Sequence, residues 1–251
     1  MAHSADPLAG GHFGPWVVLV PATGAVLAGL TVAWAGQLIG GSSVAVSLVV
    51  FAVGVFAIGW YWPRTEGRER DTFGAANRVT LLRVVGTSWA AALSVESAFG
   101  PLPPAGQLLL VALGTGCLML DGVDGRLARA RGEVSAFGAR FDMETDAALL
   151  LSLSVAVAGL TPTGWWVLAI GGLRYVYVAA SRVVPALRLP LPFRHVRKVI
   201  AVVQGAALLL ALALDLVPGV PQELRLLLLA AALVALCWSF GRDVVWQWRH
   251  R

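Results

Sequence analysis

The stretch DGVDGRLARARGEVSAFGARFDMETD, residues 121–146, carries four aspartates between two long apolar runs, LLLVALGTGCLML and AALLLSLSVAVAGL. Asp121 and Asp124 are three residues apart, so they share a face of a helix. Asp142 and Asp146 are four residues apart and share a face of the next helix. Two antiparallel helices joined by a turn would therefore direct both acid pairs into one cleft.

The composition of the whole chain is that of a multi-pass membrane protein. Of its 251 residues, 58% are hydrophobic and 13% are charged, whereas soluble domains have roughly 45–50% apolar and about 25% charged residues. We predict an all-α integral membrane protein of about eight transmembrane helices, because each crossing needs about 20 apolar residues. The apolar runs fall at 15–35, 44–62, 79–97, 105–121, 145–161, 164–183, 198–216 and 221–240.

A mixed-charge segment, PRTEGRERDTFGAAN at residues 63–77, interrupts the apolar pattern. We interpret it as a cytoplasmic linker or as an amphipathic helix at the membrane interface. It separates a two-helix N-terminal extension, residues 1–62, from a six-helix core, residues 78–251. The first apolar run has no basic segment before it and no clear cleavage site. We therefore interpret it as a retained helix, with a cleaved or re-entrant segment as the alternative.

The net charge of +5 indicates membrane topology rather than a nucleic-acid partner. Lys and Arg gather in alternate connections, whereas residues 36–43, 98–104, 162–163 and 217–220 contain none. By the positive-inside rule, both termini and the acidic stretch face the cytoplasm. We expect a bacterial cytoplasmic membrane. Cys117 and Cys237 lie in apolar runs and are interpreted as packing residues.

The acidic stretch has the chemistry of a metal and phosphate site. Crowded carboxylates repel, so either some bind protons or a cation lies among them. Oxygen ligands alone favour a hard divalent ion, Mg²⁺ or Mn²⁺. Gly122, Gly125 and Gly138 leave room for a ligand beside the acids, and Arg129 offers a planar fork suited to phosphate. Together these groups suit displacement at the phosphorus of a pyrophosphate.

The spacing of these residues resembles the signature of the CDP-alcohol phosphotransferase family. Every signature position is filled, in the order Asp121-x2-Asp124-Gly125-x2-Ala128-Arg129-x8-Gly138-x3-Asp142-x3-Asp146. Upstream, NRVTLLR resembles the segment that opens the family core, with Asn77, Thr80 and Arg83 at the usual places. The resemblance covers about residues 76–241 and implies six core helices. The first 62 residues lie outside it.

The resemblance also implies a role for each of these residues. Asp121, Asp124 and Asp142 would be the principal ligands of two divalent ions. Asp146 would be the general base that deprotonates the acceptor hydroxyl. A contact between Asp146 and the second ion is a further possibility. The residues implied to bind the nucleotide and its diphosphate are Asp121, Asp124, Gly125, Ala128, Arg129, Gly138, Asn77 and Thr80. The reaction would join a substituted phosphoryl group to an alcohol and release CMP, and the enzyme would be a homodimer.

The donor and the acceptor are less clearly indicated. Arg174 lies near the middle of a predicted helix, where a charged side chain is costly and marks a functional candidate. A basic cluster suited to an acceptor phosphate follows it, formed by Arg182, Arg194, Arg197 and Lys198. We therefore favour a CDP-diacylglycerol donor and a polyol phosphate acceptor, such as glycerol 3-phosphate or inositol phosphate. Alternatives are free serine or inositol as acceptor, a CDP-amino-alcohol donor with diacylglycerol, and basic residues that only contact anionic lipid.

Two further alternatives belong to other functional classes. A cation-binding transporter would bury its charges near the bilayer midplane, whereas these acids lie at predicted cytoplasmic helix ends. A non-catalytic scaffold or an inactive family member would not need the complete signature that this chain carries.

Overall fold

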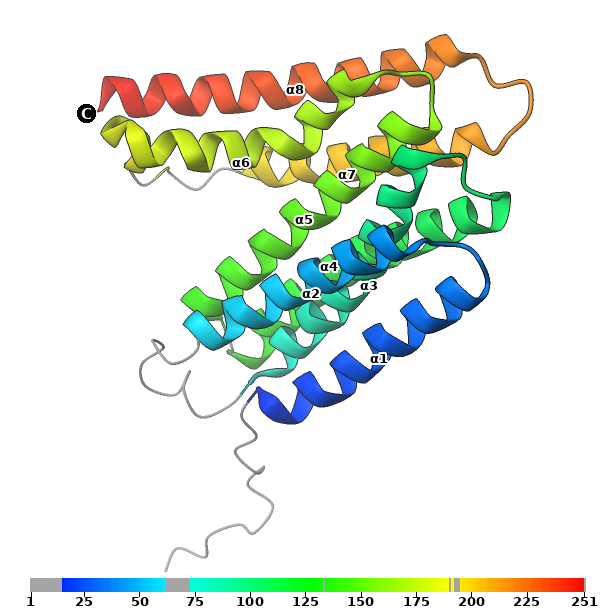
Figure 1. Ribbon diagram of the computed structural model, residues 1–251. Coiled ribbons are helices and arrows are strands. Elements are labelled where there is room, and N and C mark those ends of the chain that lie inside the picture. Colours follow the sequence, from blue (N-terminus) through cyan, green and yellow to red (C-terminus); the bar gives the residue numbers. More distant parts are fainter. Residues whose placement is uncertain (1–14, 62–72, 133, 190, 192–194, 251) are drawn as a thin grey trace, which may run out of the picture.

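The computed structural model describes residues 15–61, 73–132, 134–189, 191 and 195–250 (Figure 1). Over this part of the chain the structure is helical and contains no strand, which confirms the predicted fold class. The eight long helices are α1 (Trp16–Ala35), α2 (Gly41–Tyr61), α3 (Ala75–Phe99), α4 (Pro104–Arg131), α5 (Ala136–Leu160), α6 (Leu168–Val183), α7 (His195–Asp215) and α8 (Gln222–Arg249). Short 3₁₀ turns at Trp165–Val167 and Pro185–Arg188 flank α6.

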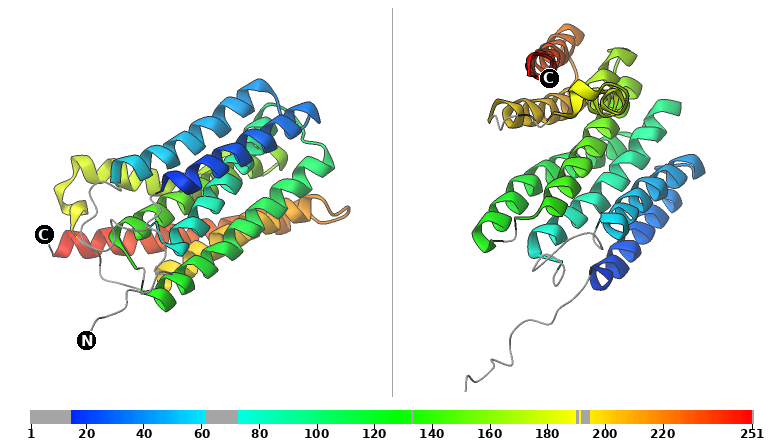
Figure 2. Two further views of the ribbon diagram at one scale, coloured as in Figure 1. Left: turned by 90° about the horizontal axis from the view of Figure 1, so that it is seen from below. Right: turned by 90° about the vertical axis from the view of Figure 1, so that its left-hand side faces the viewer.

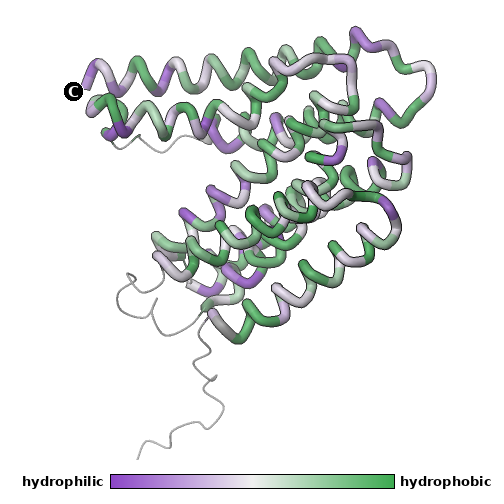
Figure 3. The backbone as a smooth tube through the Cα atoms, viewed as in Figure 1, coloured by the Kyte–Doolittle hydropathy of each residue, from purple (hydrophilic) through white to green (hydrophobic). Residues whose placement is uncertain are grey.

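Six of these helices, α1, α2, α4, α5, α7 and α8, are long and apolar enough to cross a membrane, counted over the described residues. Hydrophobic residues predominate along the chain, with hydrophilic segments at several helix ends (Figure 3). The sequence predicted eight crossings, and α3 and α6 are the two helices outside the set of six. α6 has only 16 residues. α3 has 25 residues but carries buried polar side chains, among them Asn77, Thr80, Arg83, Thr87 and Ser88.

α3 can be polar because other helices cover it. It packs against α5, α4, α2 and α1, while α6, α7 and α8 lie on the far side of α5 from α1 and α2 (Figures 1 and 2). Close helix contacts depend on glycine. A Cβ at Gly159 of α5 would lie 2.4 Å from the carbonyl oxygen of Ser97 on α3, and one at Gly171 of α6 would lie 2.4 Å from the Cα of Leu151. The backbones of α5 and α3, and those of α6 and α5, therefore lie so close together that only a small residue fits at these positions.

The acidic stretch is almost wholly helical, so the apolar runs understated the lengths of two helices. α4 continues ten residues past Asp121, and α5 begins ten residues before Asp146. Gly132 ends α4 in the left-handed conformation, with φ of 64°, which glycine adopts without steric cost. The Ser135 hydroxyl then caps α5 by accepting the N–H of Gly138 at 2.9 Å. These two helix ends join α4 to α5, the antiparallel helix pair that the sequence predicted.

α1 and α2, which lie within the predicted N-terminal extension, form a helical hairpin that packs along α3. The Glu96 carboxylate accepts the Gly40 N–H at 2.6 Å and the Ser43 hydroxyl at 2.7 Å, at the start of α2. A negative charge at this helix N-terminus is also favourable for the helix dipole. At mid-length, a Cβ at Gly29 of α1 would lie 2.4 Å from the Trp89 ring of α3. The hairpin is therefore attached to the same helix that carries the buried polar residues.

The division into extension, linker and core stays a prediction. Residues 62–72 lie outside the described part of the chain, and they include most of the predicted linker. The last three residues of that linker, 75–77, form the first turn of α3. The core helix therefore begins earlier than the apolar pattern indicated, because its first residues are polar or small.

The contacts of Glu96 predict a loss of stability when its carboxylate is removed. In Glu96→Ala, the fully buried Ser43 hydroxyl and the Gly40 N–H lose their acceptor, which costs about 1–3 kcal/mol for each buried group left unsatisfied. We expect a lower midpoint of thermal unfolding in detergent. The exposed glutamate at the start of α8 provides the matched control, Glu223→Ala. Equal midpoints for the two variants would contradict the docking role of Glu96.

Candidate active site

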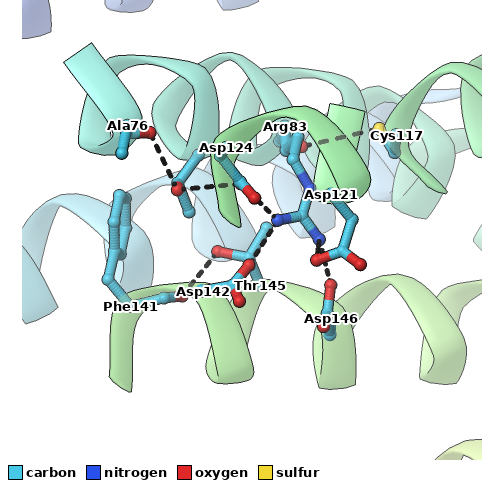
Figure 4. Close-up of polar contacts among 10 residues, drawn as sticks. Ala76, Arg83, Cys117, Asp121, Asp124, Phe141, Asp142, Thr145 and Asp146 are labelled. Atoms are coloured by element: carbon cyan, nitrogen blue, oxygen red, sulfur yellow. Dashed lines mark hydrogen bonds and ion pairs between the residues drawn. The ribbon is translucent and has the colours of Figure 1, made fainter. Parts of the chain in front are cut away.

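The site is formed where α3, α4 and α5 lie together (Figure 4). α4 contributes Asp121 and Asp124, and α5 contributes Asp142 and Asp146. The structure brings the two acid pairs together, as their spacing predicted. They meet around a residue of the third helix, Arg83 of α3.

The Arg83 guanidinium contacts all four carboxylates. Its Nη1 donates to Asp124 Oδ2 at 2.7 Å and also to Asp142 Oδ1. Its Nη2 donates to Asp146 Oδ1 and lies 3.2 Å from Asp121 Oδ1. Each terminal nitrogen therefore bridges one carboxylate of α4 and one of α5. The Arg83 side chain is fully buried.

Asp124 lies on the interior side of the cluster, since its side chain is only 4% exposed. The Thr80 hydroxyl lies 3.2 Å from the same Oδ2 that accepts from Arg83. The other three acids are about a third exposed: 31% for Asp121 and 37% each for Asp142 and Asp146. The cluster thus has a closed side at Asp124 and Arg83 and an open side at the other three carboxylates.

The three open acids have the geometry of a metal site. One carboxylate oxygen from each of Asp121, Asp142 and Asp146 can be chosen so that all lie within 4.8 Å of one another. An octahedral Mg²⁺ holds its ligands at about 2.1 Å, so neighbouring ligand oxygens lie about 3 Å apart and opposite ones about 4.2 Å apart. When ionised, the four carboxylates also exceed the single guanidinium by three negative charges. Oxygen chemistry and charge suit a hard divalent cation, and the 4.8 Å limit on the spacing of the three oxygens is slightly wider than that octahedron.

The residues predicted to bind the nucleotide lie on the same helices. Gly125 and Ala128 are half-buried on α4, and Arg129 is exposed in the last turn of that helix. Gly138 has a local packing role, because a Cβ there would lie 2.9 Å from Asn77 Oδ1 on α3. Asn77 is therefore held against the start of α5, one turn before Asp142.

The residues predicted to bind the acceptor are partly engaged elsewhere. Arg174 of α6 makes an ion pair with Glu144 of α5 at 2.5 Å. Arg197 of α7 lies 3.7 Å from the buried Asp243 of α8. The other members of the predicted set are Arg182 and Lys198, which are exposed, and Arg194, which lies outside the described residues.

Two residues of this region had no predicted role in the chemistry. Glu144 stands between Asp142 and Asp146 in sequence but points to α6, where it pairs with Arg174. The sequence assigns Arg83 to the NRVTLLR segment but predicts no role for it in the site. A sequence signal for it does exist, since an arginine within an apolar run is a functional candidate by default. Its spacing of three and six residues from Thr80 and Asn77 also puts all three near one helix face.

Comparison with known protein families agrees with this geometry. A model of the CDP-alcohol phosphatidyltransferase family matches residues 73–239, well over half of the chain. The chain belongs to this family. No curated protein and no solved structure matches it.

Membership in the CDP-alcohol phosphatidyltransferase family supports a general activity for this membrane protein. That activity is transfer of a phosphatidyl group from a CDP-linked donor, a reaction of phospholipid synthesis. The match contains Arg83 and all four aspartates and ends inside α8. The hairpin of α1 and α2 precedes it, as the resemblance predicted.

The close contact between Gly138 and Asn77 predicts that even alanine at position 138 lowers the stability of the fold. In Gly138→Ala, the new methyl group must displace Asn77 and the capping Ser135 hydroxyl, 3.1 Å away, and such overpacking costs about 1–3 kcal/mol. The control is Gly116→Ala on α4, whose Cβ meets no heavy atom of the described chain within 4 Å. Because alanine favours helix over glycine by about 1 kcal/mol, Gly116→Ala should keep or raise the thermal midpoint. Equal midpoints for the two variants would contradict a role for close packing at Gly138.

Proposed function

We propose that this protein is a divalent-metal-dependent transferase. It moves a phosphatidyl group from CDP-diacylglycerol to a small polar alcohol and releases CMP. The observation that carries the proposal is the group of three carboxylates, Asp121, Asp142 and Asp146, whose oxygens lie within 4.8 Å of one another. They stand on two helices inside the matched family region.

In the proposed site, Asp121, Asp142 and Asp146 would hold one or two Mg²⁺ or Mn²⁺ ions from the open side. Asp124, which the family signature also indicates as a ligand, would reach them from the closed side of the cluster. The ions would neutralise the pyrophosphate of the donor and the charge that develops at phosphorus. The nucleotide and its diphosphate would be bound by the residues that the family signature indicates, namely Asn77, Thr80, Gly125, Ala128, Arg129 and Gly138.

Asp146 is the proposed general base. Arg83 contacts its Oδ1, so Oδ2 is the atom that takes the proton of the acceptor hydroxyl. The acceptor oxygen then forms a bond to the phosphorus that carries diacylglycerol. The bond from that phosphorus to the bridging oxygen breaks, and CMP leaves with the electron pair. Asp146 is partly exposed, as a group that meets an incoming alcohol must be.

We propose a polyol phosphate as the acceptor. Support comes from Arg182 in the last turn of α6 and from Arg197 and Lys198 in the first turn of α7. Arg182 and Lys198 are exposed. Arg174 offers weaker support, because Glu144 already neutralises its charge. The proposed orientation puts this basic cluster and the four aspartates on the cytoplasmic side. A homodimer is expected from the family resemblance.

The proposal predicts that CMP release requires both a divalent ion and the Asp146 carboxylate. Purified protein with Mg²⁺ or Mn²⁺ should release CMP from CDP-diacylglycerol with one of glycerol 3-phosphate, inositol phosphate, inositol or serine, and chelation should stop it. Asp146→Asn should lower the rate by about 10²–10⁴-fold, the usual contribution of a positioned general base. The control Glu223→Gln changes an exposed carboxylate of α8 and should keep the wild-type rate.

The same measurement separates the alternatives. If CMP is released only from CDP-choline or CDP-ethanolamine with diacylglycerol, the donor is a CDP-amino-alcohol and the acceptor is diacylglycerol, and the proposed substrates are wrong. A folded protein that releases no CMP from any of these donors would refute the catalytic proposal.

The Arg174–Glu144 pair yields a separate prediction about the acceptor. If Arg174 binds the acceptor phosphate, Arg174→Gln should raise the acceptor KM by about 10–100-fold, because hydrogen bonds to charged groups contribute about 1.5–3 kcal/mol. The donor KM should stay the same. Glu144→Gln removes the competing partner and should leave the acceptor KM unchanged or lower. A similar rise in KM for both variants would show that the ion pair only joins α5 to α6.

A further inference from the structure

We propose that Arg83 is a positioning residue for the metal site. Its guanidinium is a fixed internal cation that holds one oxygen of each of the four aspartates, and it stays in place while metal and nucleotide bind on the open side. This inference rests on the proposed metal-dependent function. It assigns to α3 the task of setting the distance between the acid pairs of α4 and α5.

The pattern of contacts is the first support. Nη1 takes Asp124 of α4 together with Asp142 of α5, and Nη2 takes Asp121 of α4 together with Asp146 of α5. A planar guanidinium with a fixed fork of donors can bridge two rows of carboxylates in this way, whereas an ammonium group acts as a single point of charge. Each contact uses one carboxylate oxygen, Oδ2 of Asp124 and Oδ1 of the other three.

The packing of the three helices is the second support. α4 and α5 each contact α3 extensively and contact each other much less. Their two acid pairs would repel across this gap. Arg83 reaches the gap from α3, whose contacts with both helices fix its position (Figure 4). The α4–α5 spacing at the acids therefore depends on a side chain that belongs to neither helix.

The position of Arg83 on the buried side of the cluster indicates that a metal ion would bind beside the guanidinium and would not displace it. The Arg83 side chain is fully buried and lies beside Asp124, the acid that is only 4% exposed. Asp121, Asp142 and Asp146 keep exposures of 31–37%. The guanidinium thus occupies the interior side and leaves the other side open to a water-soluble nucleotide and its ions. Groups that orient metal ligands from behind affect metal affinity by about 10–100-fold.

The test compares Mn²⁺ binding among variants of the full chain in detergent, measured by electron paramagnetic resonance. Arg83→Met removes the cation, and Arg83→Lys keeps the charge without the fork. Both should weaken Mn²⁺ binding by about 10–100-fold. The control, Arg78→Met, lies on the same helix, is exposed and donates its Nε to the Phe73 carbonyl at 3.3 Å. It should keep wild-type affinity.

Thermal unfolding in chelator provides a readout that needs neither metal nor turnover. Arg83→Met should lower the midpoint strongly, because four carboxylates lose their shared cation, and saturating Mn²⁺ should restore part of the loss. If Arg83→Met does not fold, Arg83→Lys carries both measurements.

Three outcomes would overturn the positioning role. First, the Arg83 variants could bind Mn²⁺ as tightly as wild type or more tightly, which would show that the guanidinium competes with the metal. Second, Arg78→Met could lose as much Mn²⁺ affinity as the Arg83 variants, which would show that the loss follows from the change in net charge alone. Unchanged unfolding of both Arg83 variants in chelator would also refute it. If wild type itself bound no Mn²⁺, the metal-dependent function would fail, while the unfolding series in chelator would still test Arg83.

Discussion

Repulsion among four carboxylates is the constraint on which this structure depends. Two like charges 4 Å apart cost about 4 kcal/mol at an effective dielectric constant near 20, and here two pairs face each other between helices. The buried guanidinium of Arg83 offsets much of this cost through its contacts with all four acids. It does not neutralise all four when they are ionised, because one positive charge then faces four negative ones. The remaining negative charge is what would attract the divalent ions of the proposed function.

The position of that cation explains the unusual composition of α3. A helix facing lipid could not carry a fully buried arginine together with Asn77 and Thr80, because unpaired polar groups in hydrocarbon are costly. α3 can, because α4 and α5 cover its polar side and the α1–α2 hairpin packs against it as well. Glu96 attaches the start of α2 to the other end of the same helix. The hairpin outside the family match therefore completes the protein environment of the helix that organises the site.

Features set by local sequence could be predicted, and features set by contacts between helices could not. The pairing of Asp121 with Asp124 and of Asp142 with Asp146 follows from helical spacing, and the eight helices follow from apolar runs. The apolar run alone ends at residue 121, and helical spacing carried the prediction only to the acids; the continuation of α4 to Arg131 has no hydropathy signal, because its last residues are polar. Arg83 was not recognised as the centre of the cluster, since its partners lie 38 to 63 residues away on other helices. The Glu144–Arg174 pair was missed for the same reason.

The two arginines that pair with carboxylates of α5 differ in what their surroundings permit. Arg83 is fully buried and contacts four acids. When these acids are ionised, a single guanidinium leaves three negative charges without a partner, which is the charge that the proposed metal ions would balance. Arg174 is partly exposed beside one acid, so that pair is formally neutral and has no excess charge of its own. An acceptor phosphate can bind Arg174 only if it competes with Glu144 or shares the guanidinium with it. The proposed metal binding therefore follows from the charge balance of the core. Any contribution of Arg174 to acceptor choice depends on how readily this partly exposed ion pair opens.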